Sequence, residues 1–197
     1  MSQSSRPRST AALAASLTGL ALAVAGCGGD DEPKAKADAG PKFMTVPPGV
    51  EAKTVRAIDG DTLVVEINGK KEKVRLLGID APEFSKSKKG DQECGGELAR
   101  GAMRQLVKRS PTVTVSKDPT QDERDQYGRL LAYVSSPDTK VANTWNGALL
   151  SSGWAELYEQ QGKPVTLDPE FKRQFAAAKT AGAGVHGICD GDFHQEL

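Results

Sequence analysis

Hydrophobic and polar residues alternate along two stretches in the middle of the chain, residues 62–67 and 72–79. A period of two is typical of strands that bury one face. Asn68 and Gly69 lie between the two stretches, and this pair is a strong signal for a tight hairpin turn. Residues 55–58 lead into Asp59-Gly60, another turn signal, before the first stretch. The pattern therefore predicts a meander of three antiparallel strands.

The spacing of apolar residues becomes helical from Leu98 onward, and Ser110-Pro111 ends that helix. In the last predicted helix, Asp168 would be the N-cap and Pro169 the first helical residue. The order of elements predicts an α+β fold, mainly β: a partly open five-stranded Greek-key barrel of the OB type with about three helices. The remaining strands and helices are expected at 113–115, 130–134, 143–152 and 168–181.

The first 26 residues have the pattern of an export signal. Arg6 and Arg8 precede an uncharged apolar run over residues 11–25, which is short for a membrane-spanning helix. The run ends in small residues followed by Cys27, which resembles a bacterial lipobox. We expect lipidation of Cys27 and a protein anchored to the cell membrane, facing outside or into the periplasm. The alternative is a plain signal peptide with an accidental cysteine.

The rest of the chain divides into a tether and one domain. Residues 27–50 are rich in Asp, Lys, Ala, Gly and Pro, with little that could pack, and are expected to be a flexible tether. Residues 51–190 are long enough to bury one hydrophobic core. Residues 191–197 are interpreted as a C-terminal tail.

Charge counts against binding to nucleic acid. Loss of residues 1–26 would remove two arginines and leave 24 basic against 26 acidic residues. A protein that binds nucleic acid without sequence preference is usually basic. If the chain binds nucleic acid, local basic residues and a metal ion would have to compensate for this excess of acidic residues.

Two cysteines, Cys94 and Cys189, remain in the predicted domain. An even number of cysteines in an oxidising compartment favours a disulfide between them. Two buried free thiols are the alternative.

Asp61 and Asp80 lie at the ends of adjacent predicted strands, where a meander can bring their carboxylates together. Two carboxylates in one site repel each other unless a cation lies between them. Ca²⁺ accepts carboxylates, carbonyls and water in irregular geometry more readily than Mg²⁺ does. We therefore predict a calcium site formed by Asp61, Asp80 and the carbonyl of Ala81, although each motif alone could be a simple turn.

Three charged residues could carry chemistry beside this ion. Glu83 follows a proline that stiffens its loop, and it is the candidate general base for activating a water. Arg75 and Arg129 have planar guanidinium groups suited to bidentate contact with phosphate. We expect both arginines to be exposed at a cleft. His186 and His194 lack partners at metal-ligand or nucleophile spacing, and no role is assigned to them.

Three motifs in order resemble the staphylococcal nuclease (thermonuclease) family. They are residues 58–62 (IDGDT), 75–83 (RLLGIDAPE) and 127–133 (YGRLLAY), and the likeness spans about residues 55–188. The resemblance implies an OB-type barrel with three helices and Ca²⁺-dependent hydrolysis of DNA and RNA. It further implies cleavage at the 5′ P–O bond, which leaves 3′-phosphates.

The resemblance implies the same metal ligands, base and phosphate clamps as the residues themselves, and it adds two contacts. Tyr127 matches a tyrosine that contacts the nucleotide, and Lys89 matches a loop lysine near the nucleic acid. Ala81 stands where the family often has Thr, and Gln126 stands where a lysine can face the terminal phosphate. We expect DNA and RNA as substrates, Ca²⁺ as cofactor, a membrane contact through Cys27, no protein partner and a monomer.

Two other functions are compatible with the sequence. A catalytically silent module on the same barrel could bind single strands by stacking and charge. A surface protein could bind calcium or peptidoglycan, with the site serving only structure. The set of carboxylates and arginines favours the enzyme, because a pure binder would not need buried like charges.

Overall fold

The computed structural model describes residues 44–84, 92–137 and 144–197, which include all eleven helices and strands assigned below. The strands are β1 (Gly49–Ala57), β2 (Thr62–Ile67), β3 (Lys70–Leu76), β4 (Ile79–Asp80), β5 (Thr112–Ser116), β6 (Leu130–Ser135) and β7 (Glu156–Leu157). The helices are α1 (Gly96–Arg109), α2 (Trp145–Ser151), α3 (Asp168–Ala181) and α4 (Val185–Ile188). In these described residues, no helix has the length and apolar content needed to cross a membrane.

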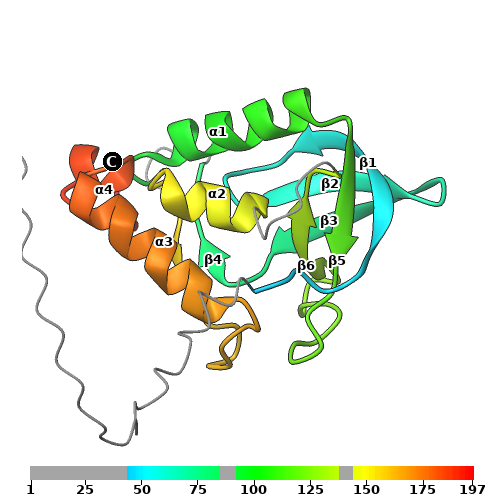
Figure 1. The fold of residues 1–197 in the computed structure, drawn as a ribbon. Helices are drawn as coiled ribbons and strands as arrows, with labels where there is room; N and C mark the ends of the chain where they lie inside the picture. Colours follow the sequence, from blue (N-terminus) through cyan, green and yellow to red (C-terminus); the bar gives the residue numbers. More distant parts are fainter. Residues whose placement is uncertain (1–43, 85–91, 138–143) are drawn as a thin grey trace, which may run out of the picture. The chain divides into compact units, whose positions relative to one another are not determined.

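Five strands form a closed barrel in the order β1-β2-β3-β6-β5 (Figure 1). β3 and β6 are parallel, whereas the other neighbours are antiparallel, and β1 closes the barrel against β5. This is the predicted five-stranded barrel of the OB type. The expectation that it is partly open was wrong, because β1 extends to Gly49 and its first half pairs with β5 from Gly49↔Ser116 to Lys53↔Thr112.

The barrel interior explains the alternating pattern of the sequence. Leu63 and Val65 of β2 are fully buried, and they lie in register with β3 through Leu63↔Val74 and Val65↔Glu72. Asn68 and Gly69 both have positive φ in the hairpin between these strands. The predicted strand 72–79 is in fact divided into β3 and β4 by a turn at Gly78, where φ is +75°.

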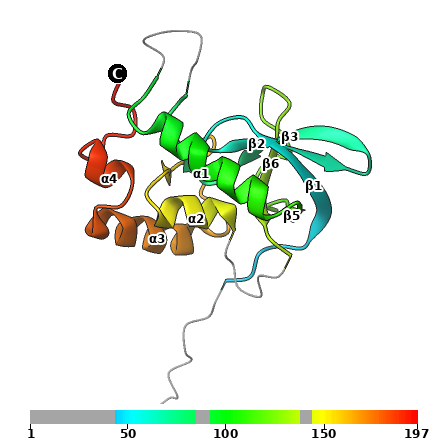
Figure 2. The same ribbon diagram turned by 90° about the horizontal axis from the view of Figure 1, so that it is seen from above.

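The helices cover one end and one side of the barrel (Figures 1 and 2). α1 buries Ala99 and Met103 in the main core, in agreement with its helical spacing. α2 begins after Thr144, whose side chain accepts a hydrogen bond from the Gly147 amide, so it starts later than predicted; residue 143 lies outside the described residues. α3 begins at Asp168, one residue earlier than predicted, so Leu167 and not Asp168 is its N-cap.

The C-terminal segment is part of the packed domain. Val185, Cys189 and Phe193 are buried in a second, smaller core beside α3. A disulfide joins Cys189 to Cys94, which lies just before α1, with 6.0 Å between the two Cα atoms. Residues 191–197, interpreted above as a tail, therefore belong to the fold, and the expected tether overlaps β1 at residues 49–50.

Candidate active site

Asp61 and Arg75 are neighbours because of the register of the β2–β3 hairpin. Thr62 pairs with Arg75, and the amide of Leu76 donates to the carbonyl of Asp61 at 2.9 Å. Both charged residues lie at the end of the hairpin away from its turn, and both are buried, with 6% of Asp61 and 8% of Arg75 exposed. The hairpin therefore holds a carboxylate and a guanidinium side by side, with little of either exposed to solvent.

Asp80 reaches the same site through the turn at Gly78. The chain reverses there into β4, in which Asp80 pairs with Glu156 of β7. The next amide, that of Ala81, donates to Asp61 Oδ2 at 3.1 Å. The predicted proximity of Asp61 and Asp80 is thus produced by backbone pairing on one side and a backbone hydrogen bond on the other.

The Arg75 guanidinium connects the two aspartates. Its Nη2 lies 2.6 Å from Asp80 Oδ1 and 3.0 Å from Asp61 Oδ2. Its Nη1 donates to the carbonyls of Leu76 and Ile79, at 2.9 and 2.6 Å. Arg75 is therefore a buried structural cation as well as a potential phosphate ligand, and the expectation that it is exposed was wrong.

Arg129 approaches from the loop before β6, and Asp125 orients it. Asp125 Oδ2 accepts from Arg129 Nε at 2.5 Å, and Oδ1 accepts from the Tyr127 and Arg129 amides, each at 2.9 Å. Arg129 Nη1 also lies 3.4 Å from the hydroxyl of Thr62. Tyr127 is 75% exposed, and the centroid of its ring is 5.5 Å from the Arg129 guanidinium carbon.

A cleft with a volume of about 410 Å³ brings these groups together. It is lined by Asp61, Arg75, Asp80, Glu83, Asp125, Gln126, Tyr127, Arg129, Tyr158, Gln160 and Gln161. The Arg75 guanidinium carbon lies 5.7 Å from the centroid of the Tyr158 ring. The lining is mainly polar and includes four carboxylates against two guanidinium groups, so it suits a cation and an anionic ligand rather than an apolar one.

Burial and like charges raise the pKa of three carboxyls at the site. Burial, and then the neighbouring Asp61 carboxylate, raises the pKa of Asp59 to about 7. Burial raises the pKa of Asp80 to about 6, with Asp61 adding to the rise and Arg75 opposing it. Burial, followed by Asp61 and Glu93, also raises the pKa of Glu83. These shifts are typical of carboxylates that lack sufficient positive charge.

The structure places most of the predicted site residues in the cleft. Ala81 is buried beside Asp61, Glu83 is exposed at the rim, and Tyr127 lies over Arg129. Lys89 and Cys27 lie outside the described residues. Sequence reasoning missed Asp125, Tyr158, Gln160 and Gln161, although the Asp125 spacing of four from Arg129 is a recognisable ion-pair signal.

His194 was assigned no role, but it lies at the edge of this site. Its ring nitrogens lie 2.9 Å from Glu93 Oε1 and 3.0 Å from Glu156 Oε1, and 3.9 Å from Asp80 Oδ2. The hydrogen bond to Glu93 raises the pKa of His194, with a further contribution from Glu156. The sequence contains no local signal for this cluster, because His194 and Glu93 are 101 residues apart.

The donor set fits a hard divalent cation. Within residues 44–84, 92–137 and 144–197, no three His, Cys, Asp or Glu side chains are arranged to hold a metal by themselves. However, Asp61 and Asp80 both contact the same cationic nitrogen, Arg75 Nη2, and both line the open cleft. Two carboxylates completed by carbonyl and water oxygens match the preference of Ca²⁺.

Proteins with an OB-type barrel commonly bind their ligands on the barrel surface. Here that surface carries a polar cleft of carboxylates and arginines. The model of the family described as staphylococcal nuclease homologue matches residues 73–186, which is more than half of the chain. The chain belongs to this family. The matched range includes Arg75, Asp80, Glu83 and Arg129, and it ends before the C-terminal segment.

Several curated proteins are similar to the chain. The thermonuclease of Staphylococcus hyicus is 38% identical over 82 residues, covering 42% of this chain and 46% of the thermonuclease. An uncharacterized endonuclease of Escherichia coli is 38% identical over 118 residues, covering 60% of this chain and 67% of that protein. Endonuclease YncB of Bacillus subtilis is 41% identical over 113 residues, covering 56% and 50%. The chain thus spans about half to two thirds of the length of these relatives.

Proposed function

We propose that this protein is a calcium-dependent phosphodiesterase that hydrolyses DNA and RNA at the 5′ P–O bond and leaves 3′-phosphates, acting at the cell surface. The observation that carries the proposal is the convergence of Arg75, Arg129, Asp61, Asp80 and Glu83 on one cleft. The names of the similar thermonuclease and endonucleases support the same class of reaction.

Each charged group of the cleft has a distinct task. Asp61, Asp80 and the Ala81 carbonyl would hold Ca²⁺, and the ion would supply positive charge to a phosphate oxygen and to a nearby water. Glu83 lies at the rim with a raised pKa, and it accepts the proton of the attacking water. The raised pKa makes the Glu83 carboxylate a stronger base than an ordinary glutamate.

The two arginines would both bind the phosphate. Arg129 lines the cleft and is fixed through Nε by Asp125, so its outer nitrogens can contact phosphate oxygens. Arg75 shares Nη2 between two carboxylates, so this nitrogen becomes available when those carboxylates bind another cation. Both guanidinium groups stabilise the charge that grows on the phosphate oxygens during attack.

Digestion of single-stranded DNA by Glu83→Gln protein tests this function. Wild-type protein should cleave with Ca²⁺ present and stop with excess chelator, leaving 3′-phosphate ends. Glu83→Gln should lower the rate by about 10²–10⁴-fold, because the base is lost, while Ca²⁺ affinity and unfolding stay close to wild type. A folded wild-type protein that binds single strands but never cuts them would instead indicate the silent binding module.

We also propose that the protein is exported as a monomer and anchored through lipidated Cys27. The small residues before Cys27 and the disulfide between Cys94 and Cys189 support export, since disulfides persist mainly in oxidising compartments. Cys27→Ser protein expressed in a bacterial host tests the anchor. It should leave the membrane fraction, and retention of this variant in membranes would contradict lipid anchoring.

A further inference from the structure

Glu93 makes two hydrogen bonds with the backbone of Glu83. The Glu83 amide donates to Glu93 Oε2 at 2.6 Å, and the Glu93 amide donates to the Glu83 carbonyl at 3.1 Å. The amide and the carbonyl on either side of the candidate base are therefore fixed by the same partner. A hydrogen bond to a charged acceptor is stronger than a neutral one, so the amide contact is the firmer of the two.

The C-terminal segment pairs with the other side of residues 92–94. The Cys94 amide donates to the Gln195 carbonyl at 2.8 Å, and the Leu197 amide donates to the Gln92 carbonyl at 3.0 Å. An antiparallel bridge between Glu93 and Glu196 lies between these two bonds. Glu93 thus connects the candidate base on one side to the end of the chain on the other.

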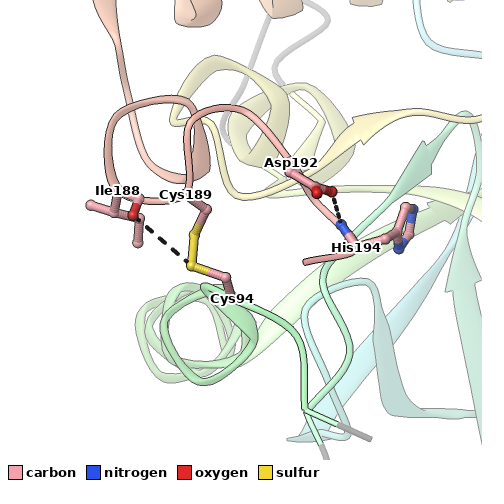
Figure 3. The surroundings of a disulfide bond; sticks show 5 residues. All are labelled: Cys94, Ile188, Cys189, Asp192 and His194. Atoms are coloured by element: carbon pink, nitrogen blue, oxygen red, sulfur yellow. Dashed lines mark hydrogen bonds between the residues drawn. A yellow bond between two sulfur atoms is a disulfide. The ribbon is translucent and has the colours of Figure 1, made fainter. Parts of the chain in front are cut away.

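The side chain of His194 completes the connection. Its Nδ1 lies 2.9 Å from Glu93 Oε1, while Oε2 of the same carboxylate accepts from Glu83. The His194 amide donates to Asp192 at 3.0 Å, which fixes the turn that carries the ring (Figure 3). Cys189, three residues before Asp192, is bonded to Cys94, so both ends of the segment are attached to the residues that precede α1 (Figure 3).

We propose that the C-terminal segment, residues 189–197, positions Glu83 for catalysis, with Glu93 and His194 as positioning residues and the disulfide as the anchor. This inference rests on the proposed function, in which Glu83 is the base. Glu83 is exposed, so the hydrogen bonds that Glu93 makes with its backbone contribute directly to fixing its position. A displacement of a catalytic group by about 1 Å can cost about 100-fold in rate.

Four variants and two measurements test the inference. Glu93→Ala and His194→Ala remove the connection, Glu93→Gln keeps an acceptor for the Glu83 amide, and Gln195→Ala keeps the backbone pairing while changing an exposed side chain of the same segment. The His194 side chain is 51% exposed, so its loss should leave the protein folded. The measurements are amide hydrogen exchange at Glu83, and kcat and KM for single-stranded DNA with Ca²⁺.

We expect the Glu83 amide to exchange about 10–100-fold faster in Glu93→Ala protein, which loses the charged hydrogen bond. It should also exchange faster in His194→Ala protein, because the Glu93 carboxylate loses the partner that orients it. The kcat of both variants should fall, by about 10–100-fold for Glu93→Ala, with KM unchanged. Glu93→Gln should lie between Glu93→Ala and wild type, because a neutral acceptor remains, and Gln195→Ala should stay within about threefold of wild type in both measurements.

Several results would overturn the inference: unchanged exchange at Glu83, a rise in KM at constant kcat, or an equal loss in the Gln195→Ala control. Reduction of the disulfide should also lower kcat, under conditions where circular dichroism shows folded protein. Full activity of the reduced protein would contradict the role of the disulfide as the anchor. If wild-type protein cut no nucleic acid, the proposed function would fail, while exchange at Glu83 would still decide whether the segment holds this residue.

Discussion

Replacing Arg75 with alanine tests whether this residue is both a clamp and a structural cation. The change removes a buried guanidinium that contacts the Asp61 and Asp80 carboxylates and the carbonyls of Leu76 and Ile79. Loss of one partner leaves the other charges buried and unpaired, which typically costs about 3–5 kcal/mol. We therefore expect the free energy of unfolding to fall by about this amount.

Urea unfolding followed by circular dichroism measures the effect. With a urea slope of about 2 kcal/mol/M, the loss corresponds to a midpoint about 1.5–2.5 M lower than wild type. Added Ca²⁺ should recover part of this loss, because an ion between Asp61 and Asp80 would replace the missing positive charge. A midpoint equal to that of wild type would contradict the structural role of Arg75.

Arg129→Ala is the matched control. Its side chain is 27% exposed, and Asp125 would keep the hydrogen bonds from the Tyr127 and Arg129 amides, so the free energy of unfolding should fall by less than in Arg75→Ala protein. Both variants should lose about 10²–10³-fold in kcat, because each removes a donor to the developing phosphate charge. A normal rate in either folded variant would contradict its assignment as a clamp.

Three further changes test the fold and the cleft. Asp118→Asn should cost about 2–3 kcal/mol at neutral pH, because buried Asp118 accepts hydrogen bonds from Tyr133 and four other donors. Burial acts to raise the pKa of Asp118, but these hydrogen bonds outweigh it, and the net result is a lowered pKa. The stabilisation should therefore fade as the pH of the unfolding assay falls below about 4, where the carboxylate becomes protonated. Gly153→Ala should be far more destabilising than Gly162→Ala in thermal unfolding. Both glycines have a φ of +70°, but only at Gly153 would a Cβ overlap the backbone after α3. Tyr127→Ala should raise KM for single-stranded DNA by about 5–100-fold with unchanged stability, because the exposed ring offers only a stacking surface.

The barrel and the convergence of the site could be predicted from local patterns. Alternation in residues 62–67 and the turn at Asn68 and Gly69 determine the hairpin, and the hairpin determines that Asp61 lies beside Arg75. The connection from β3 through Gly78 then returns the chain to the same place. These features depend on neighbouring residues in the sequence, so they are readable without a structure.

The burial of Arg75 could not be predicted by the same logic. A charged residue in an alternating strand is expected to face solvent, but Val74, Arg75 and Leu76 at the end of β3 are all buried. This stretch lies between β2 and β6 in the sheet. The turn at Gly78 brings β4 back over it, so both of its faces are covered. Alternation of buried and exposed residues is expected in a strand with one face open to solvent. It does not hold where another segment of the chain packs over the end of the strand.

The contacts that sequence reasoning missed join residues far apart in the chain. Asp118 bonds Thr166 across 48 positions, and His194 reaches Glu93 across 101. No local pattern connects such residues, because their proximity results from how α3 and the C-terminal segment dock on the barrel. The disulfide was the exception, since the pairing of the two cysteines of the domain needs only their number and the compartment.

The different partners of the cleft carboxylates indicate where a cation belongs. Asp125 has its own arginine and two backbone amides, and its side chain is 4% exposed, so its charge is already balanced. Asp61 and Asp80 must share one nitrogen of Arg75, and Glu83 contributes a further negative charge at the rim. The unbalanced charge therefore lies on the β2–β4 side of the cleft. An ion bound there would lie in the cleft that Glu83 and Arg129 also line, so positive charge, a base and a phosphate ligand would share one cavity.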